Sequence, residues 1–352
     1  MLHNFVIKKS GKTRERKPIG KRAPASADTH LGRIIRLLTT YATVVVSGTK
    51  IASEIGVSRS EVWRLVQELR ALGVDIAGHP ATGYQLKSMP DLLLPEILAP
   101  LVQGTIFGKQ IHHFYKIQST NTAAMEAASA GASEGSVFVA EQQTAGRGRG
   151  AHQWHSARST GIYCSVVLRP VLSPSDVLVL ALAGGLAVHA AVQEIDPRVP
   201  VDLKWPNDLL IGEKKFCGIL IEMNAEVTRV RHLVAGFGIN VNQTSFPADL
   251  ANIATSLRQA TASEWSRVEL CAALLRSLDG EYSNLLQNPD ARSSILRRFQ
   301  ERSSSVRGRP VHVEENGGFE GITEGLDGRG FLQVRTVQGL RTVLSGTVRT
   351  KS

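Results

Sequence analysis

The sequence predicts a multidomain α+β protein with a basic tail and three folded parts. The chain has 352 residues, more than the roughly 100–200 residues that one domain usually holds. A helix-turn-helix pattern lies near the N-terminus, a long middle part mixes helical and strand patterns, and short alternating strands lie near the C-terminus. We expect the tail over residues 1–28 and the three folded parts over residues 29–90, 91–302 and 303–352.

Composition places the chain among soluble globular proteins. It is 42% apolar and 20% charged, and its most apolar stretch, residues 177–191, contains two glycines and a histidine. That stretch is shorter than the ~18 apolar residues of a membrane span, so we expect a buried helix and no membrane association. The three cysteines lie far apart, which argues against a disulfide framework or a cysteine-rich zinc site and favours buried thiols in the cytoplasm.

The basic character belongs to the N-terminal tail. The net charge is +10, and residues 1–27 alone hold eight basic residues against the single acid Glu15. Such a segment buries too little apolar surface to fold, so a solvated, disordered tail is the favoured interpretation and nucleic-acid contact is the alternative. A targeting peptide is less favoured, because the segment has no apolar core and its lysines outnumber its arginines.

Residues after the tail carry a helix-turn-helix pattern that begins at Gly48 and ends at Gln67. Apolar spacing over residues 31–38 predicts a first helix, and Gly56 supplies the tight turn after a short second one. Ser58 and the acid three residues later form a capping box for the third helix. Residues 72–86 predict a β-wing, with a turn at residues 82–84.

The third helix carries side chains suited to the major groove of DNA. The predicted contacts are Ser58, Arg59, Ser60, Trp63, Arg64 and Gln67. A protein–protein module is the alternative, because winged helices can lose their DNA contacts. The basic tail just before the motif favours DNA.

Three short blocks carry the chemistry of the middle part. The first, Ser119-Thr120-Asn121, precedes an alanine-rich helix to about residue 132. Alone it predicts a helix N-cap, although the same hydroxyl and amide groups suit a small neutral polar ligand. The paired His112 and His113 nearby lack metal-ligand spacing, so we expect them to be packed or at the surface.

The second block is a glycine loop with two arginines. A β-branched strand that begins at Val137 leads directly into the Gly-Arg-Gly-Arg-Gly run of residues 146–150, and another strand follows over 162–168. Glycine permits close backbone approach, and arginine forks match phosphate or carboxylate oxygens. The spacing fits neither a Walker loop nor a Rossmann fingerprint. A flexible RGG-like nucleic-acid segment is the alternative, and the flanking strands argue against it.

The third block is Lys204-Trp205-Pro206-Asn207-Asp208. A lysine between apolar neighbours needs an anionic partner, and the proline fixes a bend that would aim it. Asn and Asp are otherwise ordinary turn residues. A β-rich stretch over residues 214–222 follows, and a later strand ends in the glycine-containing run of residues 236–242.

In order and spacing, these blocks resemble the bifunctional biotin protein ligase and biotin operon repressor family. The resemblance runs from about residue 32 to the C-terminus. It implies a winged helix, a class II synthetase-like (SH2-like) mixed α/β ligase domain and an SH3-like C-terminal β-barrel. Alternating strands over residues 310–313, 321–323 and 331–334, with turns at 327–328 and 338–339, agree with the last of these.

The resemblance also implies roles for individual residues. The biotin site would contain Ser119, Thr120, Asn121, Gln143, Arg147, Gly148, Arg149 and Lys204. The nucleotide site would contain Gly146, Arg149, Trp154, Lys204, Asn207 and Asn240. Catalysis would rest on Lys204, Arg147 and Arg149, and Asp208 is a candidate Mg²⁺ ligand by position and charge.

The implied reaction joins biotin to ATP with Mg²⁺ and then transfers biotin from biotinyl-5′-AMP to a lysine of a biotin carboxyl carrier protein, an acetyl-CoA carboxylase subunit or another biotin-dependent carboxylase. Fixed cations bring two anions together, and no enzyme nucleophile is needed. The adenylate-bound form would dimerise and repress biotin genes at operator DNA. A monofunctional ligase, a biotin-sensing transcription factor and a lipoate ligase are the alternatives.

One departure from the family pattern concerns the loop. Members commonly continue it with a further glycine and arginine before the tryptophan, whereas residues 150–153 here are Gly-Ala-His-Gln. The missing arginine bears on how tightly the adenylate is retained.

Overall fold

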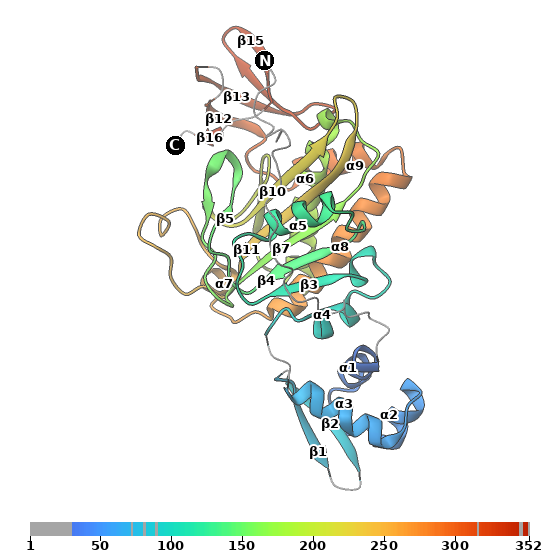
Figure 1. The fold of residues 1–352 in the computed structure, drawn as a ribbon. Helices are drawn as coiled ribbons and strands as arrows, with labels where there is room; N and C mark the ends of the chain where they lie inside the picture. The colour runs from blue at the N-terminus through green and yellow to red at the C-terminus, as the bar shows by residue number, and fades with distance from the viewer. Residues whose placement is uncertain are drawn as a thin grey trace.

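The computed structural model describes residues 30–71, 73–79, 82–88, 91–314, 317–344 and 348–350. The predicted tail over residues 1–28 lies outside this part of the chain. The described residues form an N-terminal domain, a central domain and a C-terminal domain arranged along an elongated molecule (Figure 1). The mixed α+β architecture is therefore as the sequence predicts.

The N-terminal domain is a winged helix. Its elements are α1 His30–Thr40, α2 Gly48–Ile55, α3 Arg59–Ala71, β1 Asp75–His79 and β2 Gly83–Ser88. Gly56 has a φ of 75°, the left-handed conformation that ends α2. Ser58 Oγ accepts the Glu61 N–H at 3.2 Å, but the Glu61 carboxylate binds Arg64 instead of closing the capping box. The predicted turn is displaced, because Gly83 already lies in β2.

The central domain is built on a seven-stranded mixed sheet in the order β3-β4-β7-β11-β10-β9-β8, in which only β3 and β4 are parallel. Its strands are β3 Ile111–Phe114, β4 Val137–Ala140, β7 Gly161–Leu168, β8 Val201–Lys204, β9 Asp208–Ile211, β10 Lys214–Ala225 and β11 Val230–Asn240. A separate two-stranded hairpin consists of β5 Gly146–Arg147 and β6 Gln153–Trp154.

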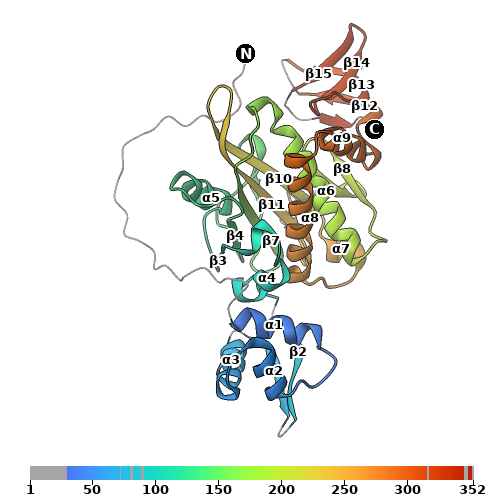
Figure 2. The same ribbon diagram turned by 90° about the vertical axis from the view of Figure 1, so that its right-hand side faces the viewer.

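Helices cover the two faces of this sheet unequally. The helices of the domain are α4 Pro95–Leu101, α5 Thr120–Ser129, α6 Leu178–Ile195, α7 Leu257–Thr261, α8 Arg267–Gln287 and α9 Ala291–Glu301, with short 3₁₀ turns at η1 Ile106–Gly108, η2 Arg149–Ala151 and η3 Pro174–Asp176. Helices α6, α8 and α9 pack on one face, and α5 alone packs on the other (Figure 2). We call the second face the open face.

Strand alternation assigns side chains to the two faces. On β10 and β11, Ile219 and Phe237 pack toward Gly184 of α6. The residues next to Ile219 and Phe237 along each strand, including Gly218, Gly236 and Gly238, therefore belong to the open face. There, Phe138 and Val167 form a small apolar cluster with the alanines of α5.

Helix α6 is a core helix. With the turn before it, Pro174–Ile195 is 22 residues long and apolar enough to cross a membrane, yet 72% of its most apolar window is buried inside the protein. The buried helix expected over residues 177–191 is confirmed, although it is longer than expected. Cys164, Cys217 and Cys271 are free and buried, as predicted.

The C-terminal domain is an antiparallel sheet in the order β15-β14-β13-β12-β16. Its strands are β12 Arg307–Val313, β13 Phe319–Leu326, β14 Leu332–Thr336, β15 Gly339–Val343 and β16 Val348–Thr350. The indole of the buried Trp205 donates to the Gly330 carbonyl at 2.9 Å and joins this domain to the β8–β9 turn. At the opposite end of the central domain, α1 of the winged helix packs on α4.

Candidate active site

The glycine–arginine run forms a β-hairpin, which we call the arginine hairpin (residues 146–154). Gly146 pairs with Trp154 and Arg147 with Gln153, and the Gly148 N–H donates to the His152 carbonyl at 2.7 Å. The sequence predicted a loop here; in the structure Arg147 lies in strand β5, and Arg149 begins the 3₁₀ turn η2.

The hairpin reaches the open face through Trp154, whose indole lies on glycines of β10 and β11. A Cβ atom added to Gly238 would lie 2.5 Å from Trp154 Cε2, and one added to Gly218 would lie 3.0 Å from Cζ3. The distance at Gly238 is too short for a side chain, and the one at Gly218 would force the indole to shift. Glycine is thus required for this packing at Gly238 and favoured at Gly218.

A buried polar cluster lies beside this contact, at the start of α5. Ser119, Thr120 and Asn121 are each at most 5% exposed. The Thr120 N–H donates to Gln143 Oε1 at 2.9 Å, and Ser165 Oγ donates to Asn121 Oδ1 at 2.6 Å. Ser119 also accepts the Thr122 N–H at 3.4 Å, so the predicted cap exists. The same residues both begin the helix and form a buried polar cluster.

Glu222 of β10 connects this cluster to the hairpin. Its carboxylate accepts from Asn121 Nδ2 at 3.1 Å and pairs with Arg147 Nη1 at 2.9 Å. Glu222 was not singled out from the sequence. Its spacing of four residues from Gly218 in one strand would have indicated it, because such residues share a face.

Arg149, the second arginine, binds the β8–β9 turn. Its Nη1 donates to Asn207 Oδ1 at 3.1 Å, and Asn207 is held in turn through its Nδ2, which donates to the Ile219 carbonyl at 2.7 Å. Burial lowers the pKa of Arg149, and the nearby charge of Asp208 opposes that shift. The guanidinium is therefore a partly desolvated cation beside Asn207 and Asp208.

Two lysines, Lys215 and Lys204, lie next to Asp208 in different ways. Lys215 Nζ pairs with Asp208 Oδ1 at 2.6 Å and lies 5.4 Å from the Trp154 ring centroid. Lys204 is opposite Asp208 in the strand register, but within the described part of the chain its ammonium makes no hydrogen bond or ion pair. Lys215, which sequence reasoning left unassigned, thus lies among the predicted site residues.

The Asn240 side chain binds the segment that follows β11 in this structure. Its Nδ2 donates to the Thr255 carbonyl at 3.1 Å and its Oδ1 accepts from Gln243 at 3.2 Å. Both bonds hold the segment that follows β11. The amide keeps a second N–H and a second lone pair, so its nucleotide contact stays a prediction.

The acidic groups do not form a dedicated metal site. Over the described residues, no three His, Cys, Asp or Glu side chains lie close enough together to hold an ion, and the Asp208 carboxylate is bound by Lys215. Mg²⁺ commonly binds through one or two carboxylates together with substrate phosphates. The residues present therefore do not fit an all-protein Mg²⁺ site.

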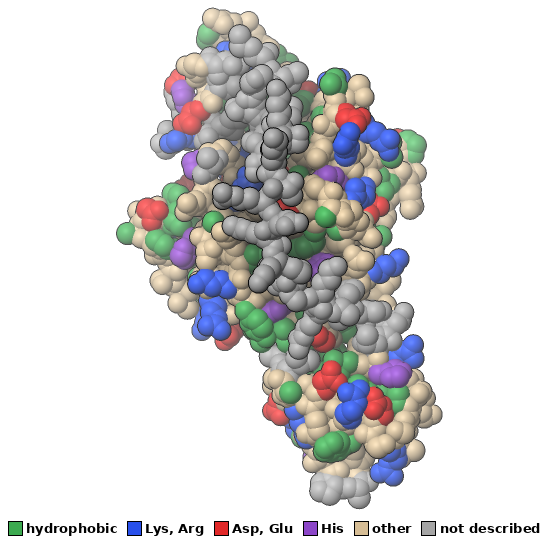
Figure 3. Space-filling model, in the orientation of Figure 1, with side chains coloured by type: hydrophobic (Ala, Val, Ile, Leu, Met, Phe, Trp, Pro, Cys, Tyr) green, Lys and Arg blue, Asp and Glu red, His purple; other side chains and the backbone are tan. Residues whose placement is uncertain are grey.

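The predicted DNA-contacting side chains lie on α3 and its N-terminal cap. Trp63 is 58% exposed, and Arg59 and Ser60 are exposed as well. Arg64, however, pairs with Glu61 at 2.7 Å and Glu68 at 3.1 Å. Figure 3 shows basic and acidic side chains side by side on this domain. The helix surface is thus mixed in charge.

Comparison with known proteins agrees with these observations. Residues 113–240 match the biotin/lipoate A/B protein ligase family, residues 31–85 an HTH domain and residues 307–349 the biotin protein ligase C terminal domain. The chain is 34% identical to the bifunctional ligase/repressor BirA of Bacillus spizizenii, over 90% of this chain and 97% of that protein. The chain belongs to the bifunctional biotin ligase/repressor family.

Two further proteins are similar to part of this chain. The biotin–[acetyl-CoA-carboxylase] ligase of Mycobacterium tuberculosis is 34% identical over 61% of this chain and 79% of its own length. The structure of the biotin protein ligase from Aquifex aeolicus in complex with biotin and ATP is 29% identical, with a TM-score of 0.61 over 69% of this chain and all of that chain.

Proposed function

We propose that the open face beneath the arginine hairpin makes biotinyl-5′-AMP from biotin and ATP and passes biotin to a lysine of a biotin carboxyl carrier protein. We also propose that the winged helix makes the chain a biotin-responsive repressor of biotin synthesis genes. Family membership supports both parts, and the solved relative bound to biotin and ATP supports the two substrates.

The reaction has two balanced steps. A biotin carboxylate oxygen attacks the α-phosphorus of ATP, a new O–P bond forms, and pyrophosphate leaves. The amine of the carrier lysine then attacks the acyl carbon, an amide forms, AMP leaves and the amine loses a proton. Neither step needs an enzyme nucleophile, so the protein contributes binding, orientation and charge.

The polar cluster suits the neutral head of biotin. Thr120, Asn121, Gln143 and Ser165 offer mutually hydrogen-bonded hydroxyl and amide groups, buried in all but the half-buried Gln143. A ligand with matching donors and acceptors would exchange these bonds, while an apolar one would leave them unpaired. This asymmetry would make the cluster selective for a polar ring.

Positive charge on the opposite side suits the reacting groups. Lys215 lies beside the Trp154 ring. The partners of Arg147, Arg149 and Lys215, which are Glu222, Asn207 and Asp208, are groups that an incoming carboxylate or phosphate could displace. We assign Lys215 the main role at the reacting phosphate, because it combines a mobile ammonium with contact to the Trp154 surface. Lys204 stays a candidate ligand of the same anions.

Further features of the family accompany this proposal. Mg²⁺ would enter with the ATP phosphates and offset their charge. The central domain would be class II synthetase-like, and the five-stranded C-terminal sheet an SH3-like barrel, with domain limits at residues 29–90, 91–302 and 303–352. We further propose that the protein acts in the cytoplasm and dimerises once the adenylate is bound.

One observation carries the ligase proposal: the arginine hairpin brings two cations and Trp154 onto the glycines of β10 and β11 beside the buried polar cluster. The test is transfer of labelled biotin from biotin and MgATP to a purified carrier domain. Labelled carrier is expected. Absence of label under conditions where the protein is folded would contradict the site assignment.

A monofunctional ligase is the second candidate, and the charge pairing on α3 favours it, since Arg64 is already bound by two glutamates. The discriminating test is a mobility shift on the DNA upstream of the organism's biotin genes. Labelled carrier without any shift would mean that the winged helix does not repress.

A further inference from the structure

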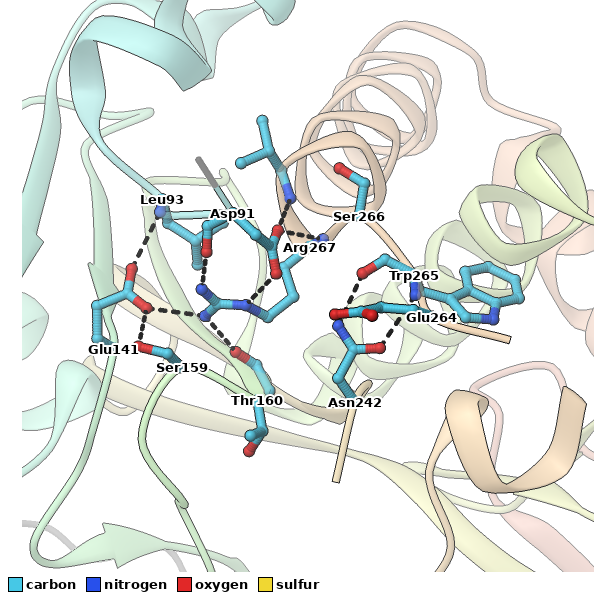
Figure 4. A network of polar contacts seen from close by, with 12 residues as sticks. Asp91, Leu93, Glu141, Ser159, Thr160, Asn242, Glu264, Trp265, Ser266 and Arg267 are labelled. Atoms are coloured by element: carbon cyan, nitrogen blue, oxygen red, sulfur yellow. Dashed lines mark hydrogen bonds and ion pairs between the residues drawn. The ribbon is translucent and has the colours of Figure 1, made fainter. Parts of the chain in front are cut away.

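A fully buried arginine lies on the boundary between the winged helix and the ligase domain. Arg267, the first residue of α8, has a side chain with no exposed surface and pairs with two carboxylates (Figure 4). We call the residues that meet around it the Arg267 network. They are Asp91, Leu93, His113, Glu141, Ser159 and Arg267.

The guanidinium connects three segments that are distant in the sequence. Its Nε pairs with Asp91 Oδ2 at 2.8 Å, and its Nη1 pairs with Glu141 Oε2 at 2.9 Å. Nη1 also donates to the Gly161 carbonyl at 3.2 Å, and Nη2 donates to the Asp91 carbonyl. Only the forked donors of arginine can serve all of these acceptors at once.

Glu141 holds both ends of the segment that contains the arginine hairpin. Residues 142–158 separate Glu141 from Ser159, and the two ends meet: the Ser159 N–H donates to the Glu141 carbonyl at 2.8 Å and Ser159 Oγ donates to its carboxylate at 3.0 Å. Gln143, which binds Thr120 in the polar cluster, lies two residues after Glu141. A displacement of Glu141 would therefore move the hairpin and the ligand wall together.

The same carboxylate holds the segment that leads out of the winged helix. Glu141 Oε1 accepts the Leu93 N–H at 3.0 Å. Leu94 is the N-cap of α4, the helix on which α1 of the winged helix packs. Asp91, three residues before this cap, binds Arg267. The connecting segment is thus bonded to both members of the buried ion pair.

The backbone just before Arg267 is held by a residue that follows β11. Asn242, which follows β11, donates to the Trp265 carbonyl at 2.8 Å and accepts the Trp265 N–H at 3.0 Å (Figure 4). A buried ion pair of this kind tolerates little rearrangement, because moving one partner leaves the other charge desolvated and unpaired. The network therefore favours one joint arrangement of hairpin stem and connecting segment.

We propose that Arg267 is a positioning residue that couples closure of the arginine hairpin to the placement of the winged helix. Adenylate binding would restrain the hairpin stems at Glu141, and the restraint would pass through Arg267 to Asp91 and Leu93. The coupling is reciprocal: an immobilised winged helix would increase the equilibrium affinity for the adenylate. This inference rests on the proposed ligase function, since the adenylate is the ligand that closes the hairpin.

The test is amide hydrogen exchange of the full chain, with and without biotin plus MgATP. In the wild type, ligands are expected to slow exchange in residues 144–156 and also in residues 91–98 and α1. Slowing in neither region would show that the ligands do not bind here and would contradict the proposed function. Slowing in residues 144–156 alone would overturn the coupling and leave the ligase function standing.

Asp91→Asn separates the two arms of the network. It removes the charge that binds Arg267 from the connecting segment while the Glu141–Arg267 pair remains, so adenylate formation should stay within about twofold of wild type. The ligand-induced slowing in residues 91–98 and α1 should fall by about tenfold, the size of a typical coupling. Glu269→Gln is the matched control, because Glu269 is an exposed carboxylate in the same first turn of α8. Equal slowing in Asp91→Asn and wild type would overturn the proposal.

Arg267→Lys tests the other arm with the charge retained. An ammonium cannot bind both carboxylates and both carbonyls, so the hairpin stem loses support. We expect adenylate dissociation to quicken by about tenfold, while the KM for the carrier domain stays unchanged. Binding and rate could instead fall together, in proportion to the folded protein that is lost as measured by the Tm. That result would indicate a purely structural role and would overturn the positioning role.

Discussion

The ligase face and helix α3 of the winged helix pair their charged side chains in opposite ways. At the ligase face, each cation is paired with a group from a different strand or turn: Arg147 with Glu222, Arg149 with Asn207, Lys215 with Asp208. On α3, Arg64 pairs with two glutamates of its own helix, in full contact with solvent. The first set depends on the tertiary fold, and the second would exist in the isolated helix.

The difference sets the size of effect that a substitution can have. Partly buried, tertiary pairs act in a low-dielectric environment, and losing one member leaves its partner unsatisfied. Exposed pairs within one helix contribute only a few tenths of a kcal/mol and are screened by salt. We therefore expect large, specific effects at the ligase face and small, salt-dependent ones on α3.

The largest effect is expected for Lys215→Gln. Removing a cation that stabilises a developing charge costs about 10²–10³ in rate, so biotinyl-AMP formation should fall by about that factor. The comparison variant is Lys204→Gln, at the second candidate ligand of these anions; it removes a lysine without a described polar partner and should cost less than about tenfold. The measurement is single-turnover adenylate formation; a larger loss in Lys204→Gln would reverse our assignment of the two lysines.

A large effect on stability is expected for Glu141→Gln. Burial alone would raise the pKa of Glu141. The hydrogen bond of His113, the charge of Arg267 and the Leu93 N–H together outweigh burial and lower this pKa to about 2, against an ordinary value of 4.5. Because the folded pKa is depressed, the carboxylate stabilises the fold fully above pH 4.5, by about 3 kcal/mol, and this stabilisation is lost as pH falls from 4.5 toward 2.

Urea unfolding of wild type and Glu141→Gln across that pH window provides the measurement. The gap in free energy of unfolding should be widest at neutral pH and close as the pH approaches 2. Glu269→Gln, with its exposed carboxylate, should show no such pH-dependent gap. A gap that is independent of pH would mean that the charge of Glu141 contributes nothing.

An intermediate effect is expected for Arg149→Gly, which removes the only hydrogen bond that the described structure gives between this arginine and the β8–β9 turn. The hairpin should hold the adenylate less tightly, and its release should quicken by about tenfold, the value of one charge-assisted hydrogen bond. Released adenylate would biotinylate lysines indiscriminately, visible in a streptavidin blot of mixed proteins. Unchanged target selectivity would count against the hairpin assignment.

The smallest effects are expected on α3. Arg59→Ala should weaken DNA binding several-fold and reduce the slope of affinity against salt by about one, as for a single phosphate contact. Arg64→Ala should change affinity less, because Glu61 and Glu68 already neutralise its charge. Equal or greater loss in Arg64→Ala would mean that DNA displaces both glutamates.

Local patterns predicted much of the fold. The winged helix, the buried helix α6 and the C-terminal strands follow from periodicity, caps and turn residues within short windows. The displaced wing turn is an exception, because Gly83 lies within β2 and the reversal comes before it. Pairing across the sheet, such as β8 at its edge beside β9, had no comparable local signal.

The site was predictable in its motifs and less so in its contacts. The hairpin and the cluster at Ser119 were found because each is continuous in sequence, whereas Glu222 and Lys215 become site residues only once β10 takes its register against β9 and β11. The Arg267 network was not predicted, since its members come from five segments between residues 91 and 267.

The most direct test of the central claim measures the ligase face and helix α3 in one experiment. It is a mobility shift of the full chain on the DNA upstream of the organism's biotin genes, with and without biotin plus MgATP, for wild type and Lys215→Gln. We expect the shift to become stronger with ligands in the wild type. In Lys215→Gln, which makes little adenylate, we expect the shift to be independent of the ligands. An equally strong ligand dependence in Lys215→Gln would contradict the claim that the adenylate made beneath the arginine hairpin controls DNA binding.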